Sequence, residues 1–248
     1  YFGVAVNTAK GIAMQVESSV MSFVSSFTTA FTPQITKSYA EGDKDFMVSI
    51  MCRGSKFSVF LILLFLIPLE FEAPMVLRLW LGEEPVDSAL FLRLSLICTA
   101  TMLLGNPFYQ GIIATGNIRN YQIVVTVVGC SVFPLTWLAY KIGLAVDTFY
   151  WIYFVVYNIL IWIRMWFCKR ILGFRIKNFV KGVFIPVILC TLLSIPVPGI
   201  IFFMMDDTIV RLLVLTLSSF ITSTIIILSV GMTSMERKYI LSKIHLAK

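Results

Sequence analysis

The chain has 248 residues, of which 58% are hydrophobic and only 13% are charged, and its formal net charge is +7. Apolar stretches of about 20 residues recur from end to end, the length a helix needs to cross a bilayer core. Backbone groups in that core bond only within helices or closed barrels, and these stretches are too long and continuous for barrel strands. We therefore expect an all-α, polytopic transmembrane helix bundle with no room for a soluble catalytic domain.

Seven membrane spans are predicted, and together they form a single transmembrane domain covering residues 1–248. In chain order the spans are roughly 5–32, 56–74, 88–113, 119–142, 147–168, 181–203 and 209–232.

The basic residues between the spans predict the orientation. Fifteen of the 20 Lys and Arg residues fall on one side: Lys37, Lys44, Arg53, Lys56, Arg119, Arg164, Lys169, Arg170, Arg175, Lys177, Lys181, Arg237, Lys238, Lys243 and Lys248. Short loops rich in Lys and Arg stay in the cytoplasm, so we expect Tyr1 outside and Lys248 inside. The positive charge then meets the anionic head groups of membrane lipids. Basic residues spread over span ends do not indicate a nucleic-acid partner.

Cysteine and histidine usage argues against a metal or a catalytic centre. The cysteines lie within spans or at their ends without C-x-x-C spacing, as expected of small apolar fillers: Cys52, Cys98, Cys130, Cys168 and Cys190. The one histidine, His245, lies in the tail, which excludes a zinc site or triad built on several histidines. We expect no metal and no enzyme activity.

The first span, 5–32, differs from the rest because one of its faces is polar. At about 100° per residue, its polar side chains fall within an arc of roughly 140° that holds Asn7, Lys10, Glu17, Ser18, Ser22, Ser25, Thr28 and Thr29. A surface amphipathic helix would carry more Lys and Arg. Two interpretations remain, tight packing through small residues or a polar face that lines a water-filled cavity.

Glu17 favours the cavity, because a carboxylate near mid-membrane is costly unless it meets water, a partner or a proton. Lys10 lies about 10 Å away along the helix axis, too far for an i,i+4 ion pair, so a close partner of Glu17 must come from another helix. Glu17 is the candidate for coupling to a proton or sodium ion. Lys10 either snorkels to the head groups or faces the cavity.

The third span repeats this pattern more weakly, with Ser95, Thr99, Asn106 and Gln110 on one face. Arg93 lies near its outer end, where it either snorkels or holds an anion. Prolines interrupt the third and fourth spans at Pro107 and Pro134, where they remove backbone hydrogen bonds and favour kinks, static or mobile. The last two spans have uncharged interiors and are expected at the periphery.

Residues 7–16 (NTAKGIAMQV) and 31–43 (FTPQITKSYAEGD) resemble the polysaccharide flippases of the Wzx type, which share a superfamily with the multidrug (MATE) exporters. Further similarities are LWLG at 79–82 and ATGN at 114–117. The resemblance is specific over about the first 45 residues and elsewhere concerns the rhythm of the spans. Lys10 stands where Arg is more usual in this motif, which keeps the charge but loses the two-pronged contact.

The resemblance implies that this chain is the C-terminal lobe of a two-lobe transporter whose N-terminal lobe precedes it. The implied substrate is a polyprenyl-pyrophosphate-linked oligosaccharide, flipped from the cytoplasmic to the outer leaflet of a bacterial inner membrane for O-antigen or capsule synthesis. Lys10 and Arg93 are the implied contacts of the pyrophosphate, and the wider set of substrate-binding candidates is Asn7, Lys10, Ser18, Ser22, Arg93, Asn106 and Gln110.

Two other functions are kept as alternatives. A MATE-like multidrug or cation antiporter belongs to the same superfamily, although a first span rich in Ser and Thr with a Lys differs from the aromatic and acidic linings of drug pockets. A glycan polymerase or ligase would carry a large outer loop with Arg and His, which this chain lacks. No ATP-binding G-x-x-x-x-G-K-[ST] motif is present, so we expect an ion or substrate gradient to drive transport.

Overall fold

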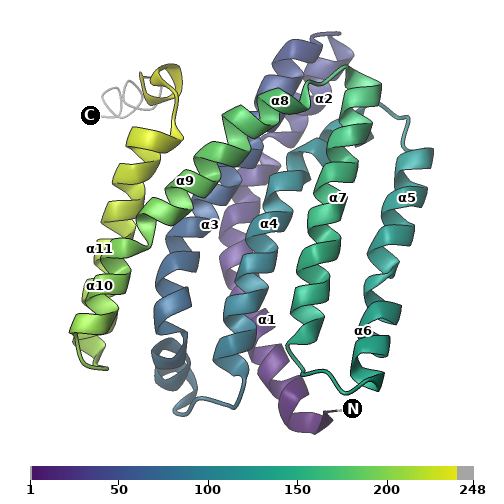
Figure 1. Cartoon of the computed structure of the whole chain (residues 1–248). Coiled ribbons are helices and arrows are strands. Elements are labelled where there is room, and N and C mark those ends of the chain that lie inside the picture. Colours follow the sequence, from purple (N-terminus) through teal and green to yellow (C-terminus); the bar gives the residue numbers. More distant parts are fainter. Residues whose placement is uncertain (1, 239–248) are drawn as a thin grey trace.

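The computed structural model describes residues 2–238, and within them the chain is a bundle of long helices without a strand (Figure 1). Tyr1, Lys243, His245 and Lys248, on which parts of the predicted orientation and chemistry depend, lie outside the described residues. The elements in chain order are α1 Gly3–Thr29, α2 Thr32–Ala40, α3 Lys44–Leu81, α4 Ser88–Ala114, α5 Arg119–Cys130, α6 Val132–Lys141, α7 Thr148–Leu172, α8 Ile176–Phe179, the π-helix η1 Val180–Phe184, α9 Ile185–Ser194, α10 Pro196–Met204, α11 Ile209–Ile226 and the π-helix η2 Ile227–Gly231.

Six helical segments of the described chain are long and apolar enough to cross a membrane. They are 44–81, 88–114, 119–141, 148–172, 176–204 and 209–231, and each overlaps one of the last six predicted spans. The all-α, multi-pass membrane architecture expected from the sequence is thereby confirmed. The first predicted span corresponds to α1. This helix has 27 residues and is long enough to cross a membrane, but it is too polar to belong to the six apolar segments.

Helix α4 is the centre of the bundle because it packs against α3 on one side and α7 on the other, with α1 across it (Figure 1). Its Leu92, Leu96, Phe108 and Ile112 are completely shielded or nearly so. In α4, 67% of the most apolar 18-residue stretch is buried inside the bundle, whereas only 11% of the corresponding stretch in residues 119–141 is buried. Two flanks complete the fold, since α5 and α6 pack on α7 while α9 to α11 pack on α3.

Proline chemistry explains the breaks within several spans. Pro134 lacks the N–H that would donate a hydrogen bond to the carbonyl of Cys130. Helix α5 accordingly ends at Cys130, and α6 begins at Val132. Helix α10 begins at Pro196, the first-turn position at which proline is tolerated. By contrast α4 continues past Pro107 as one helix, so a kink strong enough to end the helix does not occur there.

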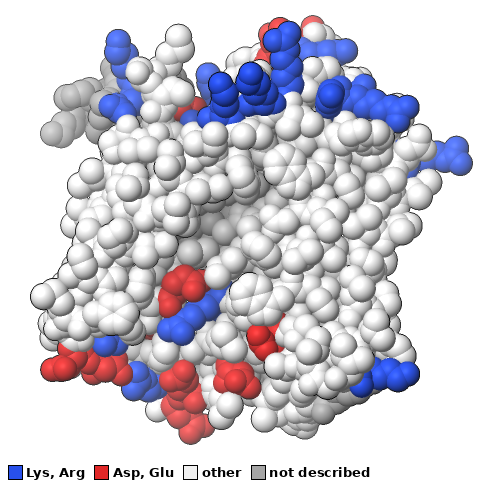
Figure 2. All heavy atoms as spheres, viewed as in Figure 1, with Lys and Arg blue, Asp and Glu red and all other residues white. Residues whose placement is uncertain are grey.

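Charge divides the bundle into two ends, as Figure 2 shows in the orientation of Figure 1. Lys and Arg gather at the end where α2 and α8 lie, which we call the basic end. Asp and Glu gather at the opposite end, near the loop between α3 and α4, which we call the acidic end. Between the ends lies a broad band that is almost free of charged side chains, apart from a small group on the side of the acidic end, consistent with a bilayer core.

Helix α3 departs from the predicted span 56–74 because it runs without interruption from Lys44 to Leu81. Both Pro68 and Pro74 lie inside it, as do the two carboxylates between them, Glu70 and Glu72, which the predicted span also included.

Candidate functional site

Helix α1 packs with its apolar stripe inward and leaves its polar face uncovered. Ala9, Ala13, Val20 and Val24 are buried against α3 and α4. The uncovered positions of the helix include several residues of the predicted polar face, namely Asn7, Ser18, Ser22 and Ser25. The polar and apolar faces are therefore divided as predicted from the sequence, with the polar one turned away from the other helices.

The hydroxyl groups on this face bond back to their own helix. Ser18 donates to the carbonyl of Gln15 at 2.9 Å, and Ser25 donates to the carbonyl of Ser22 at 3.0 Å. Elsewhere the uncovered faces of the bundle are mostly apolar; on α7, for example, they carry Trp151 and Trp162, although Gln122 and Thr126 are exposed on α5. Helix α1 is thus distinguished by a polar surface that the described chain itself does not cover.

A cavity of about 550 Å³ lies beside Lys10, between the start of α1 and helices α4, α6 and α7. The ammonium nitrogen of Lys10 lies 4.2 Å from the centre of the Phe149 ring, a cation–π distance. Aromatic rings form much of the wall, and Asn7 and Thr136 add polar groups; the full lining is Phe2, Gly3, Val4, Val6, Asn7, Lys10, Phe91, Thr136, Tyr140, Val146, Phe149 and Tyr150.

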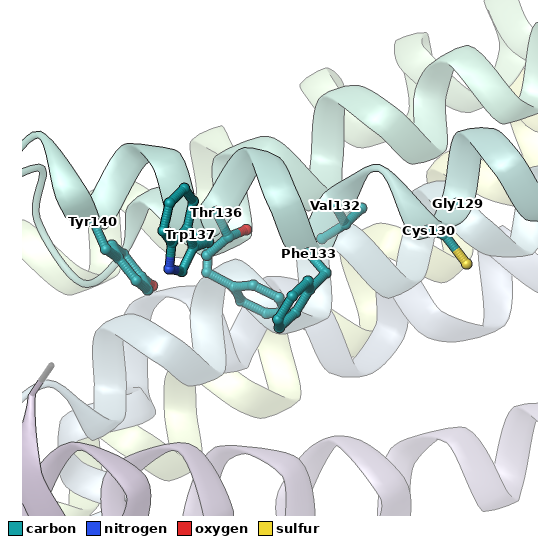
Figure 3. Close-up of a pocket in the computed structure, with 8 residues that line it drawn as sticks. Gly129, Cys130, Val132, Phe133, Thr136, Trp137 and Tyr140 are labelled. Carbon is teal, nitrogen blue, oxygen red and sulfur yellow. The ribbon is translucent and has the colours of Figure 1, made fainter.

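A second, more apolar cavity of about 400 Å³ adjoins the first along α6. Figure 3 shows its labelled side chains arranged along the α5–α6 segment, with Phe133, Trp137 and Tyr140 on successive turns. The two cavities share Thr136, Tyr140 and Phe149 as lining residues. Together they form one aromatic cleft, and Lys10 is the one Lys or Arg among its described lining residues.

Glu17 lies between α1 and α4, where the hydroxyl of Thr99 donates a hydrogen bond to its carboxylate. The expectation that its close partner comes from another helix is met. A neutral hydroxyl does not cancel the charge of a carboxylate, and Glu17 forms no ion pair among residues 2–238. No cluster of metal-ligating side chains occurs among residues 2–238.

The third-span candidates do not join the Lys10 cavity. Arg93 points to α3, where its Nη2 donates to the carbonyl of Phe71 at 3.2 Å. Ser95 is buried and donates to its own helix, and Asn106 and Gln110 are half-buried farther along α4. Asn7 and Lys10 are therefore the two candidates that the fold brings to one cavity, while Ser18 and Ser22, farther along the same face of α1, do not line it.

A charged network at the acidic end was missed by the sequence analysis. Glu72 of α3 accepts two hydrogen bonds from Arg211 of α11, from Nε at 2.7 Å and from Nη2 at 3.2 Å. Asp207 accepts from Arg211 at 2.7 Å and from Arg78 at 2.5 Å. The only sequence signal was two acids inside an apolar stretch, at Pro-x-Glu-x-Glu-x-Pro. This network fixes α11 against α3.

A second buried ion pair fixes the basic end. Lys56 of α3 is 3% exposed and donates to Glu236 at 2.6 Å. Glu236 also accepts from the backbone N–H of Thr233, at 2.8 Å, while the Thr233 hydroxyl accepts from the Glu236 N–H, as in a capping box. Burial alone would raise the pKa of Glu236, but the hydrogen bonds from Lys56 and Thr233 hold that pKa below its ordinary value.

An apolar groove of about 720 Å³ opens between α1, α3 and α11 toward the basic end. Phenylalanine and aliphatic side chains line most of it, including Phe27, Phe57 and Leu64, and the exposed Arg53 lies at its rim. The groove is separate from the Lys10 cavity and shares no lining residue with it.

No known family model, curated protein or solved structure matches this chain.

Proposed function

We propose that the chain is part of a transporter that flips a polyprenyl-pyrophosphate-linked oligosaccharide across a bacterial inner membrane, with the basic end in the cytoplasm. The observation that carries this proposal is the uncovered polar face of α1 in a bundle whose other uncovered faces are mostly apolar. Amide and hydroxyl groups on that face suit contact with water and sugar hydroxyls, which lipid does not provide. A second lobe would close the wet space on its other side.

The Lys10 cavity suits the head group of such a substrate. Aromatic rings stack on sugar faces, the amide of Asn7 offers hydrogen bonds, and Lys10 offers a charge for a phosphate. The apolar groove between α1, α3 and α11 suits the hydrocarbon tail. Glu17 is the proposed coupling residue, because a bound proton or cation would remove the cost of its half-buried charge and shift the balance between two openings of the cavity.

A chemical test of the wet face does not depend on knowing the glycan. In a full chain whose native cysteines are replaced, Ser18→Cys and Ser22→Cys should react with a membrane-impermeant maleimide in intact membranes. The matched control is Leu217→Cys, which is 63% exposed on the apolar face of α11 and should stay unreactive in the bilayer. Equal and slow reaction at all positions would mean that α1 faces lipid, and the proposed cavity would be withdrawn.

The substrate is tested by deleting the gene in its host and locating the lipid-linked oligosaccharide. Loss of surface glycan with accumulation on the cytoplasmic leaflet supports the flippase, and Lys10→Gln and Glu17→Gln should then fail to complement, whereas Thr126→Leu, on the uncovered face of α5, should succeed. Unchanged export with Glu17→Gln would refute the coupling role.

A drug or cation antiporter is the second candidate, and the aromatic lining of the Lys10 cavity is the observation in its favour. Lys10 itself argues against it, because an ammonium group repels cationic drugs. If deletion leaves surface glycan unchanged and raises sensitivity to toxic cations, this second function replaces the first.

A further inference from the structure

Two residues at the wall of the Lys10 cavity carry hydroxyl groups that have no hydrogen-bond partner within residues 2–238. They are Thr136 on α6, through its Oγ1 atom, and Tyr150 on α7, through its Oη atom, and both oxygens are shielded from the surface. Tyr150 as a whole is 6% exposed, and both residues line the cavity of about 550 Å³. A shielded polar group without a partner is destabilising, so its presence in a folded protein calls for an explanation.

Hydroxyl groups elsewhere in the bundle are commonly satisfied by their own helix. Thr191 of α9 donates to the carbonyl of Val187 at 2.8 Å, and Thr222 of α11 donates to the carbonyl of Ser218 at 2.7 Å. Thr136 makes no such bond. Shielded hydroxyls without a partner also occur at Tyr121, Ser219 and Ser223, but these residues line none of the three cavities described above. Two such groups in one cavity therefore indicate a missing ligand.

The position of the Tyr150 hydroxyl is fixed by the packing around it. Its ring centre lies 5.4 Å from that of Phe91 and 5.2 Å from that of Phe149, and both of these rings also line the cavity. The backbone carbonyl of Tyr150 accepts a hydrogen bond from the thiol of Cys98, at 3.5 Å. A ligand would therefore lose little affinity to the ordering of this side chain.

Helix α6 is the wall of the cavity that is held least firmly. Its span, 119–141, is the least buried of the six apolar segments and is interrupted at Ser131, between α5 and α6. Figure 3 shows Thr136 on α6 beside Trp137, and the adjoining cavity of about 400 Å³ leaves room next to both. A small shift of α6 at this interruption would uncover the two hydroxyls to a molecule in the cavity.

The chemistry of the lining favours a sugar ring as that molecule. The hydroxyls of Thr136 and Tyr150 can each donate and accept, as can the amide of Asn7. No Asp or Glu belongs to the described lining, and its one cation, Lys10, lies over the ring of Phe149. A pyranose offers hydroxyls that donate and accept around its edge, and an apolar face that packs on aromatic rings.

We propose that Thr136 and Tyr150 form a sugar-binding subsite of the Lys10 cavity, in which their hydroxyls exchange hydrogen bonds with those of a pyranose ring. The proposal rests on the proposed function in one respect, namely that this ring belongs to the transported glycan. Binding of the ring itself requires neither the lipid nor the phosphate. The two residues determine specificity, because a ligand without hydroxyls would leave both groups unpaired.

The probes are the methyl glycosides of glucose, galactose, mannose, rhamnose and N-acetylglucosamine, added to the purified full chain in a detergent without a sugar head group. Trp137 reports binding by its fluorescence once the other four tryptophans are replaced by phenylalanine. At least one glycoside should bind saturably, with a millimolar dissociation constant. Tyr150→Phe and Thr136→Val should each raise that constant roughly three- to tenfold, the value of one net hydrogen bond. The same ring without hydroxyls, 2-methoxytetrahydropyran, should not bind.

Matched controls come from hydroxyls that already have partners. Tyr153→Phe removes a hydroxyl that lies 3.0 Å from the sulfur of Met102, and Thr191→Val removes one bonded to its own helix. Both should leave the dissociation constant unchanged. Tyr150→Phe and Thr136→Val should not lower the melting temperature, because no hydrogen bond within the protein is lost. A clear decrease would show that these hydroxyls are paired inside the protein and would overturn the proposal.

Absence of binding by every glycoside, or an unchanged dissociation constant in either cavity variant, would also overturn it. Calorimetry on the unmodified chain replaces fluorescence if the single-tryptophan protein does not fold. Gene deletion separates this subsite from the transport function. If a glycoside binds as expected and surface glycan survives the deletion, the subsite stands and the flippase is refuted. If no glycoside binds and surface glycan is lost, the flippase stands without this subsite.

Discussion

Removal of Arg211 should detach the flank formed by α9 to α11 while the centre of the bundle stays folded. In Arg211→Met the carboxylate of Glu72, which is 1% exposed, would lose both hydrogen bonds that it accepts from the guanidinium. The Arg78–Asp207 pair at the same end would remain, but each of its side chains is 43% exposed and contributes little.

The expected cost follows from leaving a buried charge without a partner, which is about 3–5 kcal/mol in proteins. The lower limit applies here, because Glu72 lies toward the acidic end of the bundle rather than at its middle. About 3 kcal/mol corresponds to a roughly 100-fold increase in the population of the opened flank, at 1.4 kcal/mol for each factor of ten.

The native cysteines provide a local assay for this opening. Cys190 of α9 is completely shielded and directs its thiol to the carbonyl of Ile226, at 3.9 Å. Cys98 and Cys168 are buried in α4 and α7 at the centre. In detergent, Arg211→Met should accelerate maleimide labelling of Cys190 by about 100-fold, while labelling of Cys98 and Cys168, measured by peptide mass spectrometry, should not change.

The double variant Glu72→Leu/Arg211→Met is the matched control, because it removes the orphaned charge together with its partner. It should restore slow labelling of Cys190 at least in part, since apolar replacement of a buried pair is often neutral. Unchanged labelling in the single variant, or equal acceleration at Cys98, would refute the idea that this pair anchors a separable flank.

Two further outcomes test the other contacts of this flank. Because the pKa of Glu236 is lowered in the folded protein, its pair with Lys56 stabilises the folded state at pH values above the ordinary glutamate pKa of 4.5, and this stabilisation is lost as the pH falls through the lowered pKa. In Glu236→Gln the melting temperature should therefore depend less on pH below pH 5. An unchanged pH dependence of the melting temperature would contradict this expectation. Gly231→Ala would place a Cβ 2.6 Å from the Phe60 ring and should cost about 1–3 kcal/mol in unfolding, whereas Gly182→Ala, with nothing within 4 Å, should not destabilise; equal stability of the two variants would contradict this.

Local sequence pattern was sufficient for the architecture. Six apolar stretches became the six helical segments that are long enough to cross a membrane, because length and hydropathy are properties of each segment alone. The division of α1 into two faces was also predictable, since helical periodicity assigns each side chain to a face before any neighbour is known. The same reasoning required that a partner of Glu17 lie on another helix, which is where Thr99 is found.

The tertiary structure alone decided which side chains meet. Their positions within the predicted spans placed Lys10 and Arg93 near the same membrane boundary, but packing turned Lys10 toward Phe149 and Arg93 toward Phe71, so they belong to different sites. Glu72 and Arg211 are 139 positions apart, and no local pattern links them. The length and composition of each apolar stretch determine whether it forms a membrane-spanning helix. Contacts between helices depend in addition on how each helix is rotated and which helices lie beside it, and a single sequence does not specify either.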